Sequence, residues 1–151
     1  MKISSIRELE KITNKIKKAL LPGDVVFLYG EIGVGKTTFV RSLINNFELQ
    51  YKIKESEVLS PTFNIVFNYK IGKIQIMHYD LFRINKSKDI DELGIFTEEK
   101  DNIILVEWPE LIVSKPKDRI DIQFQYSKLI DSRKIKIIGF GKWKDYKFNG
   151  I

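Results

Sequence analysis

The sequence predicts a three-layer α/β fold built on a mixed sheet whose central strands run parallel. Residues 25–29 (VVFLY) and 103–106 (IILV) are uncharged apolar runs, typical of strands that are buried on both faces. Apolar residues recur at helical spacing before and after the first run, and buried strands flanked by helices favour a parallel centre. A length of 151 residues favours one domain, which we expect to span residues 1–151.

The first predicted element is an amphipathic helix over residues 6–20. Ser5 and Glu8 fit a capping box, in which a hydroxyl at the N-cap and a carboxylate three residues later satisfy free backbone N–H groups. Pro22 and Gly23 then end the helical pattern. Apolar side chains at helical spacing share one face of this helix: Ile6, Leu9, Ile12, Ile16 and Leu20.

The rest of the chain is predicted to supply a second helix and the remaining strands. Gly72 lies between two strand-like runs and favours a hairpin at that point. Two later runs with alternating apolar residues favour a second hairpin. In chain order we expect a strand (25–29), a glycine-rich turn (30–35), a helix (36–46), two strands (63–69 and 73–79), a partly helical segment (85–94), a strand (102–106) and two final strands (119–126 and 134–140).

Composition excludes several classes of protein. Hydrophobic residues make up 43% of the chain and charged residues 30%, the balance of a folded globular protein. No apolar run approaches the roughly 20 residues of a membrane-spanning helix, and residues 1–5 lack an apolar signal core. We therefore expect a cytoplasmic protein with no membrane partner. The absence of cysteine and the single His78 exclude disulfides, thiolate metal sites and multi-histidine metal sites.

The net charge of +6 is confined to the last part of the chain. Residues 1–110 hold 16 basic and 16 acidic side chains, whereas residues 111–151 hold 10 basic and 4 acidic ones. Such a basic C-terminal region is suited to contact nucleic acid or an acidic partner. The alternative is a solvated surface in a lysine-rich chain, because there are 21 Lys and only 5 Arg, the residue best suited to reading bases.

Residues 30–37 (GEIGVGKT) match the pattern G-x-x-x-x-G-K-[ST] of a phosphate-binding P-loop. The glycines allow consecutive backbone N–H groups to surround an anion, and the N-terminus of the following helix adds further donors. Lys36 can neutralise the β and γ phosphates, Thr37 can bind Mg²⁺ through its hydroxyl, and Thr38 can bond the α phosphate. An ordinary glycine turn is the alternative, but the flanking strand and helix favour a P-loop NTPase-like fold.

Two acidic residues follow predicted strands and are candidates for the metal site. Glu107 ends the run at residues 103–106, and Asp80 ends the run at residues 73–79. In P-loop proteins a carboxylate at the end of a buried strand helps to hold the magnesium ion. A solvated charge at a strand end is the alternative for either acid alone, and it weakens because two such acids accompany the loop.

The sequence favours ATP over GTP as the nucleotide. A GTPase would carry Asn-Lys-x-Asp after a strand, whereas residues 85–89 (NKSKD) have another spacing and no preceding strand. A small-molecule kinase usually needs several arginines to clamp the transferred phosphoryl group. The five arginines of this chain are not closely paired, so a kinase is disfavoured.

Four blocks together resemble one known family in their order and spacing. They are residues 30–38 (GEIGVGKTT), 59–63 (LSPTF), 78–83 (HYDLFR) and 106–110 (VEWPE). These blocks resemble the TsaE (YjeE) family, and the resemblance runs over about residues 5–140. It implies a compact P-loop ATPase that is required to form the threonylcarbamoyl group on adenosine 37 of ANN-decoding tRNAs. In that role it would drive or reset the TsaB–TsaD complex by magnesium-dependent ATP hydrolysis.

The same resemblance implies roles for individual residues. Thr37 and Glu107 resemble the family's magnesium ligands. Asp80 resembles its second essential acid, which would be catalytic with Lys36 and could either hold the metal through water or orient the attacking water. Residues 60–62 lie at the place of a switch-like loop that senses the γ phosphate. The residues that would contact ATP are Ile6, Gly33, Val34, Gly35, Lys36, Thr37, Thr38 and Arg133.

Several alternatives stay open at this point. The nucleotide could act as an assembly switch without essential hydrolysis, or the protein could be a small-molecule kinase. Contact with tRNA could be direct, through the basic C-terminal strands, or only through the TsaB–TsaD complex. His78 could be a packed or solvated ring, or it could tune Asp80 by hydrogen bonding. Trp108 could pack in the core or join a partner surface, and Arg83 could pair with an acid or reach phosphate.

Overall fold

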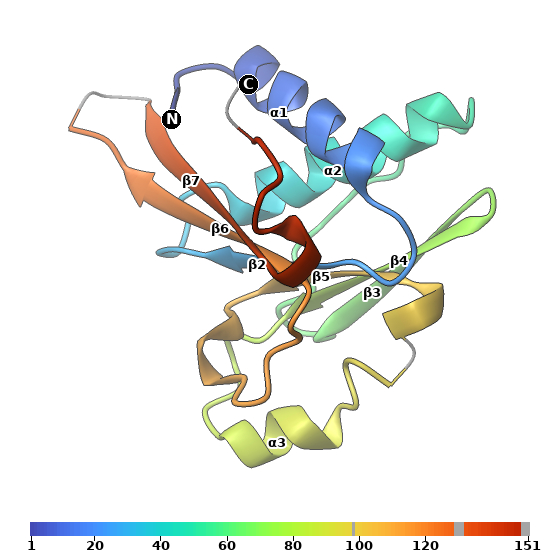
Figure 1. The fold of residues 1–151 in the computed structure, drawn as a ribbon, viewed down its shortest axis with the longest axis vertical. Coiled ribbons are helices and arrows are strands. Elements are labelled where there is room, and N and C mark those ends of the chain that lie inside the picture. The colour runs from blue at the N-terminus through green and yellow to red at the C-terminus, as the bar shows by residue number, and fades with distance from the viewer. Residues whose placement is uncertain (98, 129–131, 149–151) are drawn as a thin grey trace.

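The computed structural model describes residues 1–97, 99–128 and 132–148. Its strands form one seven-stranded sheet in the order β1-β7-β6-β2-β5-β4-β3 (Figure 1). The strands are β1 (Lys2–Ile3), β2 (Val25–Tyr29), β3 (Val66–Ile71), β4 (Ile74–Asp80), β5 (Ile103–Glu107), β6 (Arg119–Tyr126) and β7 (Arg133–Phe140). The helices are α1 (Ile6–Ala19), α2 (Lys36–Gln50) and α3 (Ser87–Glu92), with short 3₁₀ turns η1 (Glu99–Asp101), η2 (Pro109–Leu111) and η3 (Gly141–Trp143).

The centre of the sheet is parallel, as predicted. β2 runs parallel to β5 and β6, and β4 runs parallel to β5, whereas β3, β7 and β1 pair antiparallel with their neighbours. The carboxyl ends of the parallel strands therefore meet at one edge, where open α/β sheets bind their ligands. Register pairs Asp80, the last residue of β4, with Glu107, the last residue of β5.

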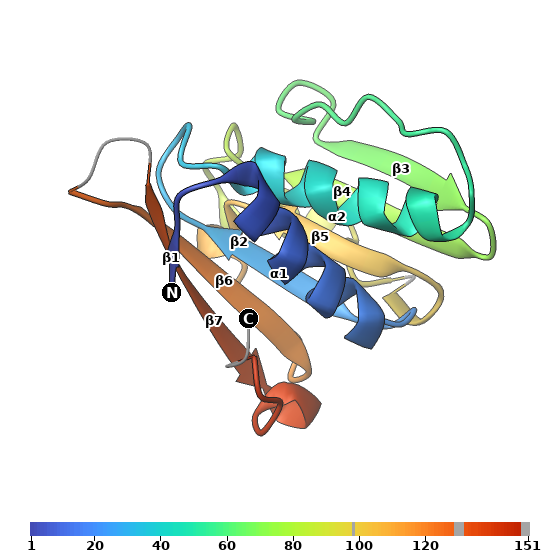
Figure 2. The same cartoon turned by 90° about the horizontal axis from the view of Figure 1, so that it is seen from above.

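Helices cover the two faces of the sheet unequally. α1 and α2 lie side by side over one face (Figure 2), above the larger core cluster. α3, η1 and η2 lie on the other face, over a second cluster that includes Phe27 and Val106 (Figure 1). The predicted three-layer α/β fold is confirmed, with a thin third layer. In the part of the chain that is described, no helix is long and apolar enough to cross a membrane.

The N-terminus of α1 is capped by side chains, as the sequence indicates. Ser5 has extended backbone angles, and its hydroxyl accepts a hydrogen bond of 3.2 Å from the backbone N–H of Glu8. The carboxylate of Glu8 accepts from the backbone N–H of Ser4 at 2.7 Å, one residue earlier than a capping box requires. The helix ends at Ala19, one residue before the predicted end, because Leu20 is extended.

Replacing Ser5 with alanine should destabilise the fold by about 1 kcal/mol, because the N–H of Glu8 loses its acceptor. For a chain of this size that corresponds to a melting temperature lower by about 2–4 °C, measurable by circular dichroism. Ser5→Asp, which keeps an acceptor at the N-cap, should restore most of the loss. An alanine variant that melts with the wild type would contradict the cap.

The predicted strands and helices agree with the observed ones to within two residues at each end, except in three places. α2 continues to Gln50 instead of residue 46, because Phe47 is 2% exposed and packs in the core. β3 begins at Val66 instead of residue 63, because Ile65 has a left-handed φ of 68° and the chain turns there. β1 was not predicted, since two residues are too few to show a strand pattern.

Candidate active site

The glycine-rich turn between β2 and α2 has the backbone of an anion-binding loop. Gly33 and Gly35 have φ values of 72° and 116°, a region that favours glycine. Gly30 has a φ of 137°, and a Cβ there would lie 2.6 Å from the carbonyl oxygen of Phe124. Gly35 is the N-cap of α2 and provides no side-chain cap. The first N–H groups of the helix therefore remain available to an anion.

Lys36 lies folded against the loop at the start of α2. Its Nζ donates hydrogen bonds to the carbonyl oxygens of Gly30 at 2.6 Å and Glu31 at 3.0 Å. The same Nζ lies 3.8 Å from the centre of the Trp108 ring, within the range of a cation–π contact. Burial lowers the pKa of the Lys36 ammonium, and the nearby carboxylate of Glu107 partly opposes this shift.

Thr37, Glu107 and His78 form a chain of contacts beneath the loop. The Thr37 hydroxyl donates to both carboxylate oxygens of Glu107, at 2.9 and 3.1 Å. The fully buried His78 places Nε2 2.9 Å from Oε1 of Glu107. The prediction that His78 hydrogen-bonds Asp80 was wrong, because its partner is Glu107. His78 is paired in register with Leu105, two residues before Glu107, so its side chain reaches the carboxylate on the neighbouring strand.

Asp80 is held by the loop that precedes β3. Its Oδ2 accepts hydrogen bonds from the hydroxyls of Ser60 at 2.6 Å and Thr62 at 2.8 Å. Its Oδ1 accepts from the backbone N–H of Phe82 at 3.0 Å. Asp80 is only 3% exposed, and these donors replace the water that its carboxylate loses on burial. The predicted switch-like loop is thus bonded directly to the second acid.

These residues line one cleft of about 320 Å³ at the carboxyl edge of the parallel strands. The cleft brings together the loop, both acids and the hydroxyl-bearing segment, which are far apart in the sequence. Its lining includes Gly33, Gly35, Lys36, Thr37, Thr38, Ser60, Thr62, Asp80, Phe82, Glu107 and Trp108.

A second cleft of about 310 Å³ lies on the other side of the loop and shares Gly33, Gly35 and Thr38 with the first. Its remaining lining includes Ile6 at the start of α1 and Arg133 at the start of β7, two residues that the family resemblance implies contact ATP. The guanidinium carbon of Arg133 lies 4.7 Å from the centre of the Tyr126 ring. The other lining residues are Ile3, Ser4, Ser5, Leu9, Val34, Phe124 and Ile135.

The first cleft suits a magnesium ion that is held jointly by protein and phosphates. Magnesium prefers oxygen ligands and typically takes one or two protein groups, with phosphates and water completing the shell. The hydroxyl of Thr37 and the carboxylate of Glu107 are such oxygens and already lie within 3.1 Å of each other. Among the described residues there is no cluster of three or more His, Asp or Glu that could hold a metal without phosphates.

Trp108 is the site residue whose position sequence reasoning left open. It follows β5 directly in a left-handed conformation, with φ 59° and ψ 54°, which turns the ring over Lys36. The Phe82 ring packs against it at 4.8 Å between centres. Arg83, whose sequence context leaves pairing with an acid or contact with phosphate open, lies with its guanidinium carbon 4.9 Å from the centre of the Phe63 ring. No local pattern around Trp108 indicates its contact with the lysine.

The contact between Trp108 and Lys36 gives an optical test of the site. Phosphates bound in the loop would draw the Lys36 ammonium towards themselves, so the surroundings of Trp108 should change. We expect tryptophan emission to change saturably when ATP is added. Trp108→Phe should remove most of this change, whereas Trp143→Phe should keep it, since Trp143 packs against Phe148 and Tyr146. A signal that disappears with Trp143 would contradict the assignment.

Comparisons with known proteins point to one family. A sequence model of the family described as "Threonylcarbamoyl adenosine biosynthesis protein TsaE" matches residues 3–135. The tRNA threonylcarbamoyladenosine biosynthesis protein TsaE of Rickettsia prowazekii is 38% identical over 110 residues, which cover 73% of this chain and 74% of that protein. The protein of the same name from Rickettsia felis is 36% identical over 110 residues, but the match spans only 62% of its length.

A solved structure agrees with this match. The crystal structure of Bacillus subtilis YdiB superposes with a TM-score of 0.76 at 25% sequence identity. The superposition covers 95% of this chain and 86% of YdiB. The P-loop, both acids and the paired clefts therefore lie on a framework that is already known from an experimental structure.

Proposed function

We propose, from the premise that this chain belongs to the TsaE family of threonylcarbamoyl adenosine biosynthesis proteins, that it is an ATPase with a magnesium-dependent active site. The family acts in the biosynthesis of threonylcarbamoyladenosine in tRNA. The observation that carries the proposal is the register of β4 and β5, which sets Asp80 beside Glu107 at the mouth of the P-loop. We propose that residues 1–151 form one ATPase domain, because every described strand joins the same sheet.

ATP would lie across the loop, with its phosphates in the cleft of Lys36 and its base in the cleft of Ile6 and Arg133. The backbone N–H groups of residues 33–38 would bind the phosphates, and Lys36 would exchange its two carbonyl acceptors for phosphate oxygens. This exchange is favourable because the ammonium meets charged oxygens instead of neutral ones. Thr38 lines both clefts and would contact the α phosphate, and Val34, which lines only the second cleft, would contact the sugar side of the nucleotide.

Thr37 and Glu107 would hold the magnesium ion, and His78 would fix the orientation of Glu107. When bound, the ion would neutralise charge on the β and γ phosphates. Lys36 would add its own positive charge on the same oxygens, so that charge developing during hydrolysis is stabilised by groups already in place.

Asp80 would orient the water that attacks the γ phosphate. It is the carboxylate in the cleft not bonded to Thr37, and it already accepts two hydroxyl hydrogen bonds from Ser60 and Thr62. Its charge lets it accept a further hydrogen bond from water and, later, a proton. Because Ser60 and Thr62 belong to the loop before β3, a change at the γ phosphate would be transmitted to that surface loop.

We propose the TsaD and TsaB proteins as the partners that this ATPase drives or resets, in forming the threonylcarbamoyl group on adenosine 37 of ANN-decoding tRNAs. The link between Asp80 and the surface loop supports partner-dependent turnover, since a partner that moves the loop would move the acid. A small-molecule kinase is disfavoured, because no arginine is found among the described residues that line the phosphate cleft.

The experiment measures release of inorganic phosphate by the purified chain alone and with purified TsaB–TsaD and substrate tRNA. We expect slow turnover alone and a rise when the partners are present. No turnover under either condition would contradict the ATPase. If a non-hydrolysable ATP analogue supports repeated rounds of tRNA modification, the nucleotide is an assembly switch and hydrolysis is not essential.

A further inference from the structure

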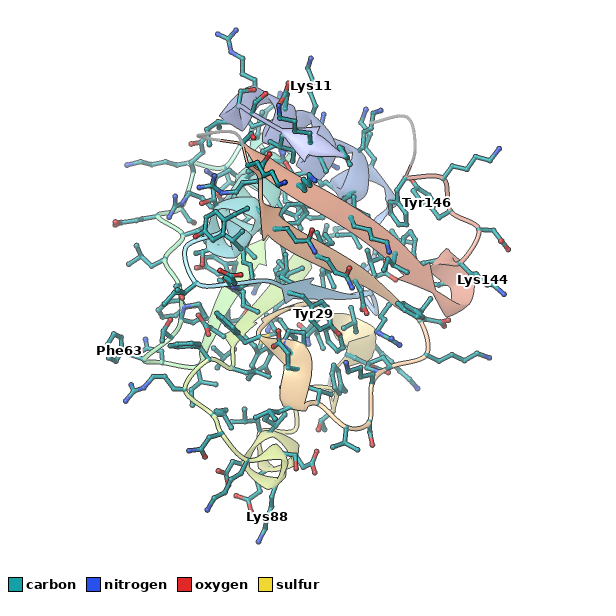
Figure 3. The ribbon with its side chains drawn as sticks, turned by 90° about the vertical axis from the view of Figure 1, so that its left-hand side faces the viewer. Lys11, Tyr29, Phe63, Lys88, Lys144 and Tyr146 are labelled. Atoms are coloured by element: carbon teal, nitrogen blue, oxygen red, sulfur yellow. The ribbon has the colours of Figure 1, made fainter. Side chains whose placement is uncertain are left out.

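Within residues 1–97, 99–128 and 132–148, no helix covers one face of the sheet in the region of β1, β7 and β6. In Figure 3 the strands β6 and β7 lie towards the viewer with no helix in front of them, and Tyr29 lies beside them. Alternate residues of these strands point to this uncovered side of the sheet, which we call the open face. The residues between them point the other way, into the core under α1: Ile3, Ile135, Ile122 and Phe124.

Lysine and glutamine side chains occupy the part of the open face next to β1, in two rows across the strands; the next rows pair Asp121 with Ile138 and Arg119 with Phe140. The first row joins Lys2, Lys134 and Gln125, which are direct partners on β1, β7 and β6. The second row joins Lys136 and Gln123. All three lysines are exposed. The ammonium of Lys115 lies near the same face, where it donates a 3.1 Å hydrogen bond to the Tyr29 hydroxyl.

The negative charge on the open face is already compensated within the chain. Asp121 lies two residues before Gln123 on β6 and is 6% exposed. Its carboxylate accepts a 3.0 Å hydrogen bond from Arg119. Among the described residues, the ion pairs involve none of the three lysines. Like charges on directly opposed residues destabilise a sheet, so Lys2 and Lys134 have a cost that a bound polyanion would remove.

The chemistry of the open face suits a nucleic acid better than a protein. Protein interfaces typically have an apolar centre, whereas the two rows consist of ammonium and amide groups. Lysine ammonium groups bind phosphates without reading sequence, and amides can bond phosphate or ribose hydroxyl oxygens. Ile3 and Arg133, the neighbours of Lys2 and Lys134 on the same strands, point to the opposite side of the sheet. There they line the second cleft, in which the base of ATP would lie.

We propose that the open face binds the phosphate backbone of the substrate tRNA. This rests on the proposed function, because tRNA is the RNA that the family's pathway modifies. The RNA would lie on one side of the β1–β7 edge and the nucleotide on the other, so that both ligands contact the same pair of strands.

The test compares two triple variants with equal loss of charge. The first combines Lys2→Gln, Lys134→Gln and Lys136→Gln. The control combines Lys11→Gln, Lys15→Gln and Lys18→Gln, which are exposed lysines on α1. Fluorescence anisotropy with a transcribed ANN-decoding tRNA is measured between 50 and 200 mM KCl, and binding of ATP with magnesium is measured for each protein by calorimetry.

We expect the first triple to bind tRNA at least about tenfold more weakly at low salt, and the slope of log affinity against log salt to shrink by about 2–3. The control triple should bind within about threefold of the wild type. Equal losses in both triples, no tRNA binding by the wild type at 50 mM KCl, or equal competition by polyglutamate would each overturn the proposal. ATP binding distinguishes failure of this inference from failure of the proposed ATPase. If the wild type binds ATP but not tRNA, only the inference about the open face is contradicted.

Discussion

Replacing Lys36 with alanine is expected to lower ATP turnover by about 100-fold or more, to the limit of detection. Among the described residues that line the phosphate cleft, Lys36 provides the only ammonium group. Because this side chain is buried, its interaction with phosphates is stronger than it would be in water. ATP affinity should fall as well, because Lys36 contacts the phosphates in the ground state and during hydrolysis. Phosphate release and calorimetric titration measure the two effects separately.

The matched control for this variant is Lys73→Ala, in the exposed turn between β3 and β4. It removes the same charge and should keep both turnover and affinity. Thermal melting of Lys36→Ala establishes that the variant is folded, since its ammonium also bonds two loop carbonyl groups and contacts the Trp108 ring. A Lys36→Ala protein with normal turnover would contradict the phosphate site.

Replacing each acid by its amide is expected to separate the two roles proposed for them. Asp80→Asn should lower turnover by about 10²-fold or more while ATP binding stays within a few-fold, because the amide still accepts a hydrogen bond but has no charge to orient water or take a proton. Glu107→Gln should lower turnover to a similar degree and also remove the strengthening of ATP binding by magnesium, because a metal ligand is lost.

Glu110→Gln is the control for both variants, because Glu110 is an exposed acid in η2, three residues beyond Glu107. It should keep turnover and magnesium dependence. Calorimetry with and without magnesium distinguishes the roles. If Asp80→Asn loses the effect of magnesium and Glu107→Gln keeps it, the roles are exchanged; if both keep full turnover, neither acid belongs to the catalytic site.

Much of the fold could be predicted because its main signals are local. The capping pattern at Ser5, the buried run of β2 and the glycine-rich turn are each readable within about ten residues. The central parallel pairing follows from buried strands flanked by helices. β1 could not be predicted, because Lys2 and Ile3 pair with Lys134 and Arg133 of β7, at the other end of the chain.

The candidate site was partly predictable for the same reason. Lys36 and Thr37 follow from a contiguous motif, and Asp80 and Glu107 were recognised as acids at the ends of apolar strands. The contact between His78 and Glu107 depends on the register between β4 and β5, which a single sequence does not specify.

Tertiary contacts also determine the position of Trp108. Its left-handed backbone turns the ring over Lys36, whose side chain comes from a helix about seventy residues earlier in the chain. Nothing in the residues adjacent to the tryptophan encodes that partner.

The most direct test of the phosphate site is calorimetric titration of the folded chain with ATP in the presence of magnesium, alone and with TsaB–TsaD. The account predicts saturable uptake of one nucleotide per chain, weakened strongly in Lys36→Ala and unaffected in Lys73→Ala. Absence of nucleotide binding under both conditions, or equal binding by wild type and Lys36→Ala, would contradict it.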